Sequence, residues 1–134
     1  MGDVNIETVQ RIYEAFGRGD VESILAWVGD DVDWGSEPES NVAPWHGRRT
    51  TKAEVVDFFT QIGANLEVTD FTPLAFASND TDVMAVIRFG IRVPATGKSG
   101  AMDLHHWWRF DGDGKIRFYR GTEDTALTKD LLTP

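Results

Sequence analysis

Apolar residues recur at helical spacing three times in the first half of the chain. The three stripes cover residues 6–16, 20–28 and 52–62. This spacing predicts three amphipathic helices. Asp20 and Thr51 stand where N-terminal caps are expected, and Glu54 completes a capping box with Thr51. The short link between the first two stripes predicts that those helices fold against each other.

Beyond residue 65 the pattern changes to an alternation of apolar and polar residues, which predicts strands with one buried face. These strands cover residues 66–77, 82–94, 101–110 and 115–123, and a shorter one covers 31–35. Pro73 predicts a bulge or break, because proline cannot donate to a ladder. We expect four antiparallel strands, with the short strand in the same sheet and no parallel pair. An irregular loop is expected over 35–50 and a helical tail from Thr125.

This order of elements predicts an α+β fold in one domain, residues 1–134. Five Trp and eight Phe suggest a large apolar interior, a ligand cavity or a hydrophobic subunit contact. The net charge of −9 argues against nucleic acid or an anionic membrane as the main partner. The absence of cysteine excludes thiolate catalysis and disulfides. With no leader and no run of membrane-spanning length, we expect a cytoplasmic protein.

Alternation along residues 101–110 divides that strand into two faces. Leu104, His106, Trp108 and Phe110 share one face, and Asp103, His105, Trp107 and Arg109 share the other. His106 is therefore one titratable group among large apolar side chains, which is typical of a pocket. A neutral imidazole there suits proton transfer near neutral pH. The alternative is a core histidine bonded to a backbone carbonyl.

The last predicted strand ends in two adjacent carboxylates, Glu123 and Asp124. Asp124 is the second catalytic candidate, either as a base or as a partner that orients His106. Its alternative is a cap for the helical tail. A bulge at Gly121 would reverse the alternation and turn Glu123 inward instead, so the choice between the two stays open. His106 and Asp124 lie on the order of 15 Å apart along the hairpin. We therefore expect a substrate to bridge them without a direct hydrogen bond.

Several large side chains are candidates for the wall of a substrate pocket, although each could equally be plain core. They are Tyr13, Trp34, Trp45, Phe58, Phe59 and Trp108. No metal is expected, because His105 and His106 point to opposite faces and only His46 remains. Phosphate-binding loops and dinucleotide fingerprints are absent from the sequence, so we expect no cofactor.

Short runs spread over nearly the whole chain resemble SnoaL-like proteins of the nuclear transport factor 2-like superfamily, which also holds ketosteroid isomerase, polyketide cyclase and limonene epoxide hydrolase. The matching runs are Tyr13-Glu14-Ala15-Phe16, Gly19-Asp20, Asp30-Asp31-Val32, Trp45-His46-Gly47, Pro94-Ala95-Thr96-Gly97-Lys98, Gly114-Lys115-Ile116 and Asp124-Thr125-Ala126. The resemblance implies a single SnoaL-like domain with the cystatin-like fold. In that fold, three N-terminal helices pack on a curved mixed or antiparallel sheet around a conical cavity.

The resemblance also implies positions for catalytic groups. His106 falls where ketosteroid isomerase has the protonated Asp of its oxyanion hole. The isomerase's base falls near Ser36, and its oxyanion Tyr falls at Ile12, one residue from Tyr13. Asp124 falls where the cyclases and the epoxide hydrolase have a catalytic Asp, but Leu104 and His106 replace the other two members of the hydrolase triad. Steroid isomerisation and epoxide opening are therefore not expected.

Together, the residues and the resemblance predict a small cofactor-independent enzyme of the isomerase, cyclase or lyase type. It would perform acid/base chemistry with His106 and Asp124 on a hydrophobic cyclic or polyketide-like molecule. One alternative is a non-catalytic small-molecule-binding protein with the same cavity. Another is an interaction module that uses its sheet only to dimerise. Because family members commonly pair through the outer sheet face, we expect a homodimer with Trp107 buried between subunits.

Overall fold

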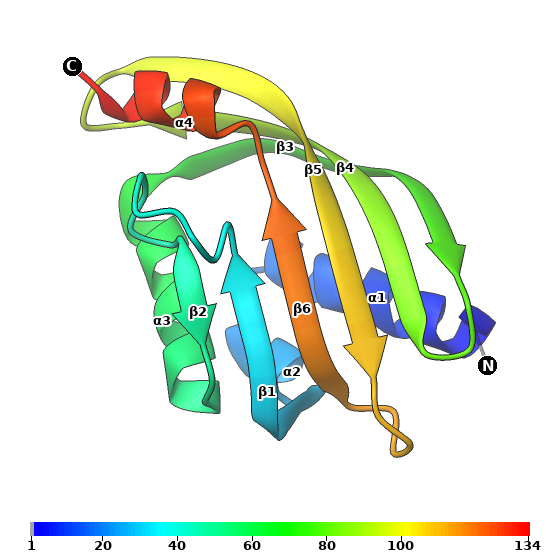
Figure 1. The fold of residues 1–134 in the computed structure, drawn as a ribbon. Helices are drawn as coiled ribbons and strands as arrows, with labels where there is room; N and C mark the ends of the chain where they lie inside the picture. Colours follow the sequence, from blue (N-terminus) through cyan, green and yellow to red (C-terminus); the bar gives the residue numbers. More distant parts are fainter. Residues whose placement is uncertain (1) are drawn as a thin grey trace.

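The computed structural model describes residues 2–134 as four helices and six strands (Figure 1). The helices are α1 (Gly2–Gly17), α2 (Val21–Leu25), α3 (Lys52–Asn65) and α4 (Thr125–Leu132). The strands are β1 (Val28–Ser36), β2 (Gly47–Arg49), β3 (Glu67–Ser78), β4 (Asp82–Val93), β5 (Lys98–Phe110) and β6 (Ile116–Thr122). The α+β class predicted from the sequence is confirmed.

All six strands form one curved sheet in the order β2-β1-β6-β5-β4-β3. The meander from β3 to β6 is antiparallel throughout, as predicted. The short strand joins the same sheet, but β1 runs parallel to β6. The expectation of no parallel pair was therefore wrong. Antiparallel neighbours can be joined by a short hairpin, whereas β1 reaches β6 only through β2, α3 and the whole meander, so no local turn sets their relative direction.

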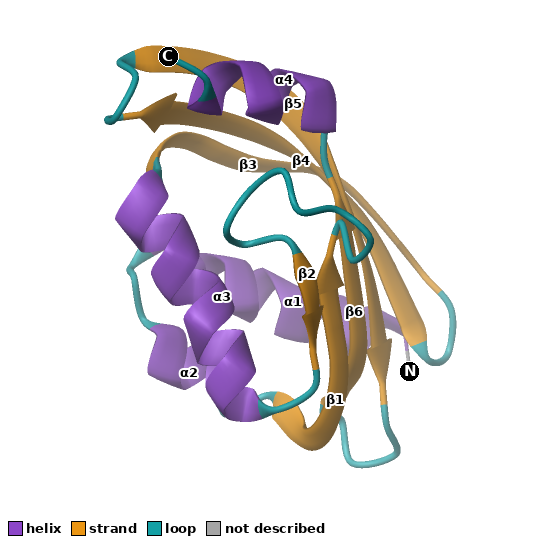
Figure 2. Ribbon diagram, turned by 60° about the vertical axis from the view of Figure 1, so that its left-hand side comes forward, coloured by secondary structure: helices purple, strands orange, loops and turns teal. Residues whose placement is uncertain are grey.

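Three helices cover the concave face of the sheet, and α4 closes its far end (Figure 2). α1 and α3 bury their apolar stripes against the sheet, with Val9, Ile12, Val55 and Phe58 among the buried residues. α4 packs on β5 where Gly100 leaves room, and the Leu131 side chain comes within 3.5 Å of a Cβ built there. This layering encloses the space between the helices and the inner face of the sheet.

The helix caps follow the sequence prediction, but some helix and strand limits differ. Asp20 accepts a hydrogen bond from the Ser23 amide, and Thr51 accepts one from the Glu54 amide. The second helix is shorter than the predicted 20–28, because the Trp27 carbonyl accepts from the Ile116 amide and the chain enters the sheet at Val28. The predicted loop over 35–50 contains β2, whose three residues are too few for a periodic pattern.

Two irregularities change which side chains face inward. The pairing of β3 with β4 shifts after Pro73, as predicted. In the last hairpin, Arg109 pairs with Phe118 while Phe110 pairs with Ile116, so β6 holds one extra residue there. The alternation of β6 is therefore reversed between Ile116 and Tyr119, both of which are buried. A reversal was considered at Gly121, and the structure has it earlier in the strand.

Candidate functional site

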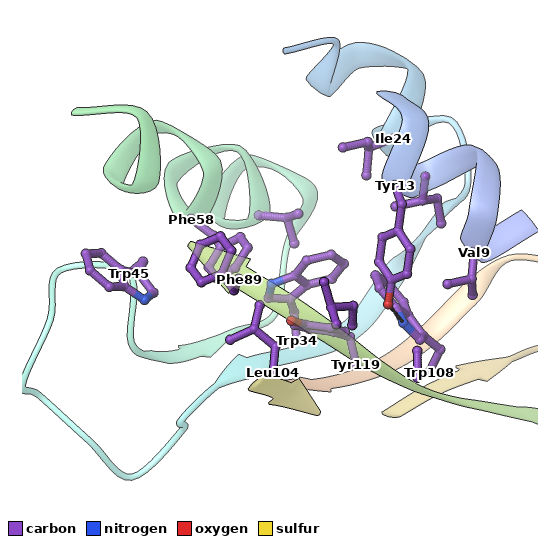
Figure 3. Packing of buried hydrophobic residues seen from close by; sticks show 14 of the residues in the cluster. Val9, Tyr13, Ile24, Trp34, Trp45, Phe58, Phe89, Leu104, Trp108 and Tyr119 are labelled. Atoms are coloured by element: carbon purple, nitrogen blue, oxygen red, sulfur yellow. Dashed lines mark hydrogen bonds between the residues drawn. The ribbon is translucent and has the colours of Figure 1, made fainter. Parts of the chain in front are cut away.

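A cavity of about 70 Å³ lies between the concave face of the sheet and helices α1 and α3. Most of its wall is aromatic or aliphatic, and Figure 3 shows part of this packing. The lining residues include Tyr13, Trp34, Trp45, Phe58, Phe59, Phe71, Phe89, Leu104, His106, Trp108, Tyr119 and Glu123. All six predicted substrate-binding side chains and His106 are in this set. Small-molecule sites are typically larger, so a ring-sized ligand requires side-chain movement.

The side chains most able to move lie beside the C-terminal end of α1, between the cavity and the outside. Phe16, Phe59, Ile62 and Phe71 line both the cavity and an external groove, and all four are only partly buried. The rings of Phe16 and Phe71 lie 5.0 Å apart, and those of Phe16 and Phe59 lie 6.1 Å apart. These partly buried side chains therefore separate the cavity from the groove, and they are the ones that would have to rotate to admit a larger ligand.

Tyr13, His106 and Trp108 form a buried hydrogen-bonded chain at one side of the cavity. The Tyr13 hydroxyl lies 2.7 Å from Nδ1 of His106, and the Trp108 indole donates to the same hydroxyl oxygen at 3.2 Å. The inward face of β5 supplies His106 and Trp108, as the alternation predicted, and α1 supplies Tyr13. Sequence alignment by position favoured Ile12 over Tyr13, but the helix turns Tyr13 toward the imidazole.

Burial keeps both Tyr13 and His106 uncharged. It lowers the pKa of His106 to about 3, with a smaller contribution from the nearby His105. It also raises the pKa of Tyr13 well above its ordinary value, which the hydrogen bond from Trp108 only partly offsets. At neutral pH the pair therefore consists of a neutral imidazole and a protonated phenol.

This neutral pair has one hydrogen more than its internal contact uses. If the Tyr13 hydroxyl donates to Nδ1, the imidazole carries its hydrogen on Nε2; if Nδ1–H donates to Tyr13, the phenol hydrogen is unused. No other described residue accepts a hydrogen bond from either group. In both tautomers one hydrogen of the pair is left available for a further hydrogen bond.

Glu123 provides the carboxylate of the cavity. The Trp45 indole donates to its Oε1 at 3.0 Å, and the Thr128 hydroxyl donates to its Oε2. Nε2 of His46 lies 3.0 Å from Oε1, although its N–H direction does not meet hydrogen-bond geometry. Burial raises the pKa of Glu123, but the contacts with His46, Thr128 and Trp45 together outweigh burial and lower it below its ordinary value. The carboxylate is therefore ionised at neutral pH.

Asp124 does not face the cavity, contrary to its predicted placement. Its side chain is exposed and accepts a hydrogen bond from the Leu127 amide at 3.0 Å, so it caps α4. The reason is the extra residue in β6, which makes Tyr119, Gly121 and Glu123 the inward positions. Without that residue the even-numbered positions, including Asp124, would point inward. The capping alternative considered for Asp124 describes its observed position.

A strained residue helps to hold Glu123 in place. Glu37 has φ of 42°, a value unusual for a residue other than glycine. Its amide donates to the Gly121 carbonyl at 2.9 Å, and its carboxylate accepts from the Glu123 amide at 2.7 Å. These two bonds join the end of β1 to the end of β6. Backbone strain that is fixed by surrounding contacts is typical of functional sites.

Sequence reasoning missed Tyr119 and the contribution of His46. Tyr119 precedes Glu123 by four residues and shares its inward face, so counting back from Glu123 in steps of two could have found it. His46 lies in the loop before β2, where no periodicity indicates which side chains point inward. Its Nδ1 lies 2.8 Å from the Ser40 hydroxyl, and its ring is fully buried. Only the folded loop brings it to the carboxylate.

Residues 2–134 show neither a metal-binding cluster nor a membrane-spanning helix. The described residues contain no group of three His, Asp or Glu side chains positioned to hold a metal ion. In the same part of the chain, no helix combines the length and the apolar character needed to cross a membrane.

The curved sheet wrapped around helices is the fold of solved nuclear transport factor 2-like structures. Residues 9–119 match the family described as the SnoaL-like domain, and the chain belongs to this family. Comparison with curated proteins gives no match.

Solved structures with the same fold cover almost the whole chain. A nuclear transport factor 2-like protein of unknown function from Burkholderia pseudomallei K96243 is 25% identical, with a TM-score of 0.88 over 97% of this chain and 98% of that one. A provisionally named polyketide cyclase from Xanthomonas campestris is 21% identical, with a TM-score of 0.75 over 96% of each chain. A provisionally named isomerase from Rhodopseudomonas palustris is 18% identical, with a TM-score of 0.77 over 96% and 93%. The last two show the shared fold alone.

Proposed function

We propose that this chain is a cofactor-independent enzyme that transfers protons on a small, largely apolar cyclic molecule. The observation that carries the proposal is a single cavity with an ionised carboxylate, Glu123, and a neutral donor pair, Tyr13 and His106. Titratable groups whose surroundings hold them in different protonation states are well suited to acid and base roles. Glu123 takes the role for which the sequence suggested Asp124.

In this proposal Glu123 accepts a proton from a carbon next to a carbonyl group. The C–H electron pair moves into the substrate, and negative charge develops on the carbonyl oxygen. The Tyr13–His106 pair donates its unused hydrogen bond to a polar atom of the substrate other than this carbonyl oxygen. The protonated Glu123 then returns the proton to the same carbon or to a conjugated one, which completes an exchange or an isomerisation. General base help of this kind is worth roughly 10²- to 10⁴-fold in rate.

The walls of the cavity support a flat, apolar substrate. Trp34, Phe58, Trp108 and Tyr119 present aromatic rings to one space, and the ring centroids of Trp34 and Tyr119 are 4.3 Å apart. Such walls favour a cyclic compound, including the polyketide-like class, over a highly charged metabolite. The ionised Glu123 further disfavours an anionic group in its vicinity.

A non-catalytic binding protein is the second candidate, and one observation favours it. Both carboxylate oxygens of Glu123 are already in contact with protein groups, and these contacts lower its pKa. A carboxylate with a lowered pKa is a weaker base. In this alternative Glu123 joins the loop before β2 to α4, and the cavity only holds its ligand.

Deuterium exchange distinguishes the two candidates without knowledge of the natural substrate. Cyclohexanone and 1-tetralone would be incubated with the protein in D₂O, and loss of the protons next to the carbonyl would be followed by NMR. We expect exchange above the buffer rate, reduced by ~10²-fold in Glu123→Gln. Asp124→Asn provides the matched control at an exposed carboxylate and should exchange at the wild-type rate. Binding of either ketone without exchange would reject the enzyme and support the binding protein.

A further inference from the structure

A second pair of hydrogen-bond donors lines the cavity, separate from Tyr13 and His106. Trp34 on β1 and Tyr119 on β6 are directly opposite each other in the parallel register. Their rings are 4.3 Å apart with an angle of 37° between the planes. In Figure 3 the indole nitrogen of Trp34 and the hydroxyl of Tyr119 both lie on the side of the rings toward Phe89 and Leu104. Both residues line the same space as these two apolar side chains.

Both donors lack a partner in the part of the chain that the structure describes. Nε1 of Trp34 is fully buried without a hydrogen bond, and Trp34 as a whole is 1% exposed. Tyr119, which is 4% exposed, lines the same cavity, and no side-chain hydrogen bond joins its hydroxyl to a described residue. Buried polar groups nearly always have partners. The unpaired indole of Trp34, with the Tyr119 hydroxyl beside it on the same cavity wall, therefore indicates that an acceptor binds there.

The groups around Trp34 and Tyr119 restrict the kind of acceptor that can bind there. An indole N–H can only donate, so the missing partner must accept. Anions are disfavoured because Glu123 lines the same cavity and the other walls are apolar. A carbonyl oxygen is uncharged and has two lone pairs, one for each donor. It can also be carried by a flat ring that packs against Phe58, Phe89 and Leu104.

We propose that Trp34 and Tyr119 form a subsite that binds the uncharged carbonyl oxygen of a cyclic ketone. The proposal deepens the proposed function, and it rests on that function only in taking this cavity as the substrate site. Trp34 and Tyr119 thereby determine which ligands bind, whereas Glu123 determines whether a bound ligand exchanges a proton. The two roles can be separated by experiment, because binding is measurable without turnover.

The test uses cyclohexanone and methylenecyclohexane, which share a shape but differ in the presence of the oxygen. Binding would be followed by ¹H–¹⁵N NMR of the five tryptophan indoles, with the Trp34 signal identified from Trp34→Phe. We expect cyclohexanone to move the Trp34 N–H signal downfield and methylenecyclohexane to leave it nearly in place. Trp34→Phe and Tyr119→Phe should each weaken cyclohexanone binding by ~5-fold or more, as loss of one hydrogen bond does, and change methylenecyclohexane binding by less than ~2-fold.

Matched controls make each outcome decisive. Trp27→Phe is the same substitution at a tryptophan outside the cavity, and it should bind both probes like the wild type. Tyr13→Phe tests whether the ketone binds at the other donor pair. The subsite is overturned if the Trp34 N–H signal does not shift when cyclohexanone binds, or if only Tyr13→Phe loses affinity for the ketone. A water molecule would then be the partner of the Trp34 indole.

The outcomes also separate this inference from the proposed function. Ketone exchange that is lost in Glu123→Gln but unchanged in Trp34→Phe and Tyr119→Phe would overturn the subsite and retain the enzyme. The expected binding pattern without any exchange would retain the subsite and overturn the enzyme. The protein is used as the full chain in every arm.

Discussion

Gly121→Ala should destabilise the protein by displacing Tyr119 from the cavity wall. A Cβ built at Gly121 lies 2.3 Å from the Tyr119 hydroxyl oxygen and 3.0 Å from its ring carbon Cζ, so the ring must move by about 1 Å. Tyr119 cannot swing freely, because its ring centroid lies 4.3 Å from that of Trp34 and 4.4 Å from that of Trp108. Forcing an extra methyl group into such packing costs ~1–3 kcal/mol. This corresponds to a fall in Tm of roughly 3–12 °C.

Urea denaturation followed by tryptophan fluorescence would measure the change. Gly112→Ala is the matched control, because a Cβ at Gly112 meets no atom within 4 Å and its stability should change little. Removing the clashing oxygen should relieve part of the strain, so in Gly121→Ala combined with Tyr119→Phe the two effects should fail to add by ~1 kcal/mol. The reasoning is refuted if Gly121→Ala is as stable as Gly112→Ala, or if the double variant is simply additive.

Three further predictions concern α4, the outer sheet face and assembly. Asp124→Ala should destabilise the protein by ~1 kcal/mol, because α4 loses its N-terminal cap. Asp124→Ser should retain most of that stability, and equal urea midpoints for the two variants would contradict the capping role. Hydrogen bonds from Arg109 lower the pKa of Asp82 from 3.8 to about 2, so its ionised form contributes stability above pH ~4 that is lost as the pH falls toward 2. After allowance for the half-exposed Arg109, the ion pair stabilises the protein by ~1–2 kcal/mol. The unfolding free energy of Asp82→Asn should therefore change less between pH 5 and 2.5 than that of the wild type. Equal pH dependence of the two unfolding free energies would exclude the effect. We also propose that the chain forms a homodimer through the outer face, where Trp107 pairs across strands with Met84, which is 49% exposed; sedimentation showing only monomer at micromolar concentration would reject this.

The local pattern of the sequence determined most of the elements and one face of the site. Helical spacing located α1 and α3, and capping residues marked where α2 and α3 begin, because these signals depend only on neighbours within one turn. Strand alternation put His106 and Trp108 on the inner face of β5, whose residues 98–109 pair with β4 without irregularity. In such a regular strand the position of one side chain predicts the others.

Tertiary structure decided the contents of the cavity. The extra residue in β6 reverses the alternation of that strand and turns Glu123, instead of Asp124, toward the cavity. This shift is visible in how Arg109 and Phe110 pair with β6, and the sequence pattern alone does not show it. The contact of Tyr13 with His106 joins residues 93 positions apart, and the parallel pairing of β1 with β6 brings Trp34 beside Tyr119. These contacts depend on register and on long-range closure of the sheet, which no local periodicity encodes. The sequence therefore predicted the fold and the position of His106, whereas the carboxylate and the donors that accompany His106 were decided by how distant segments pack.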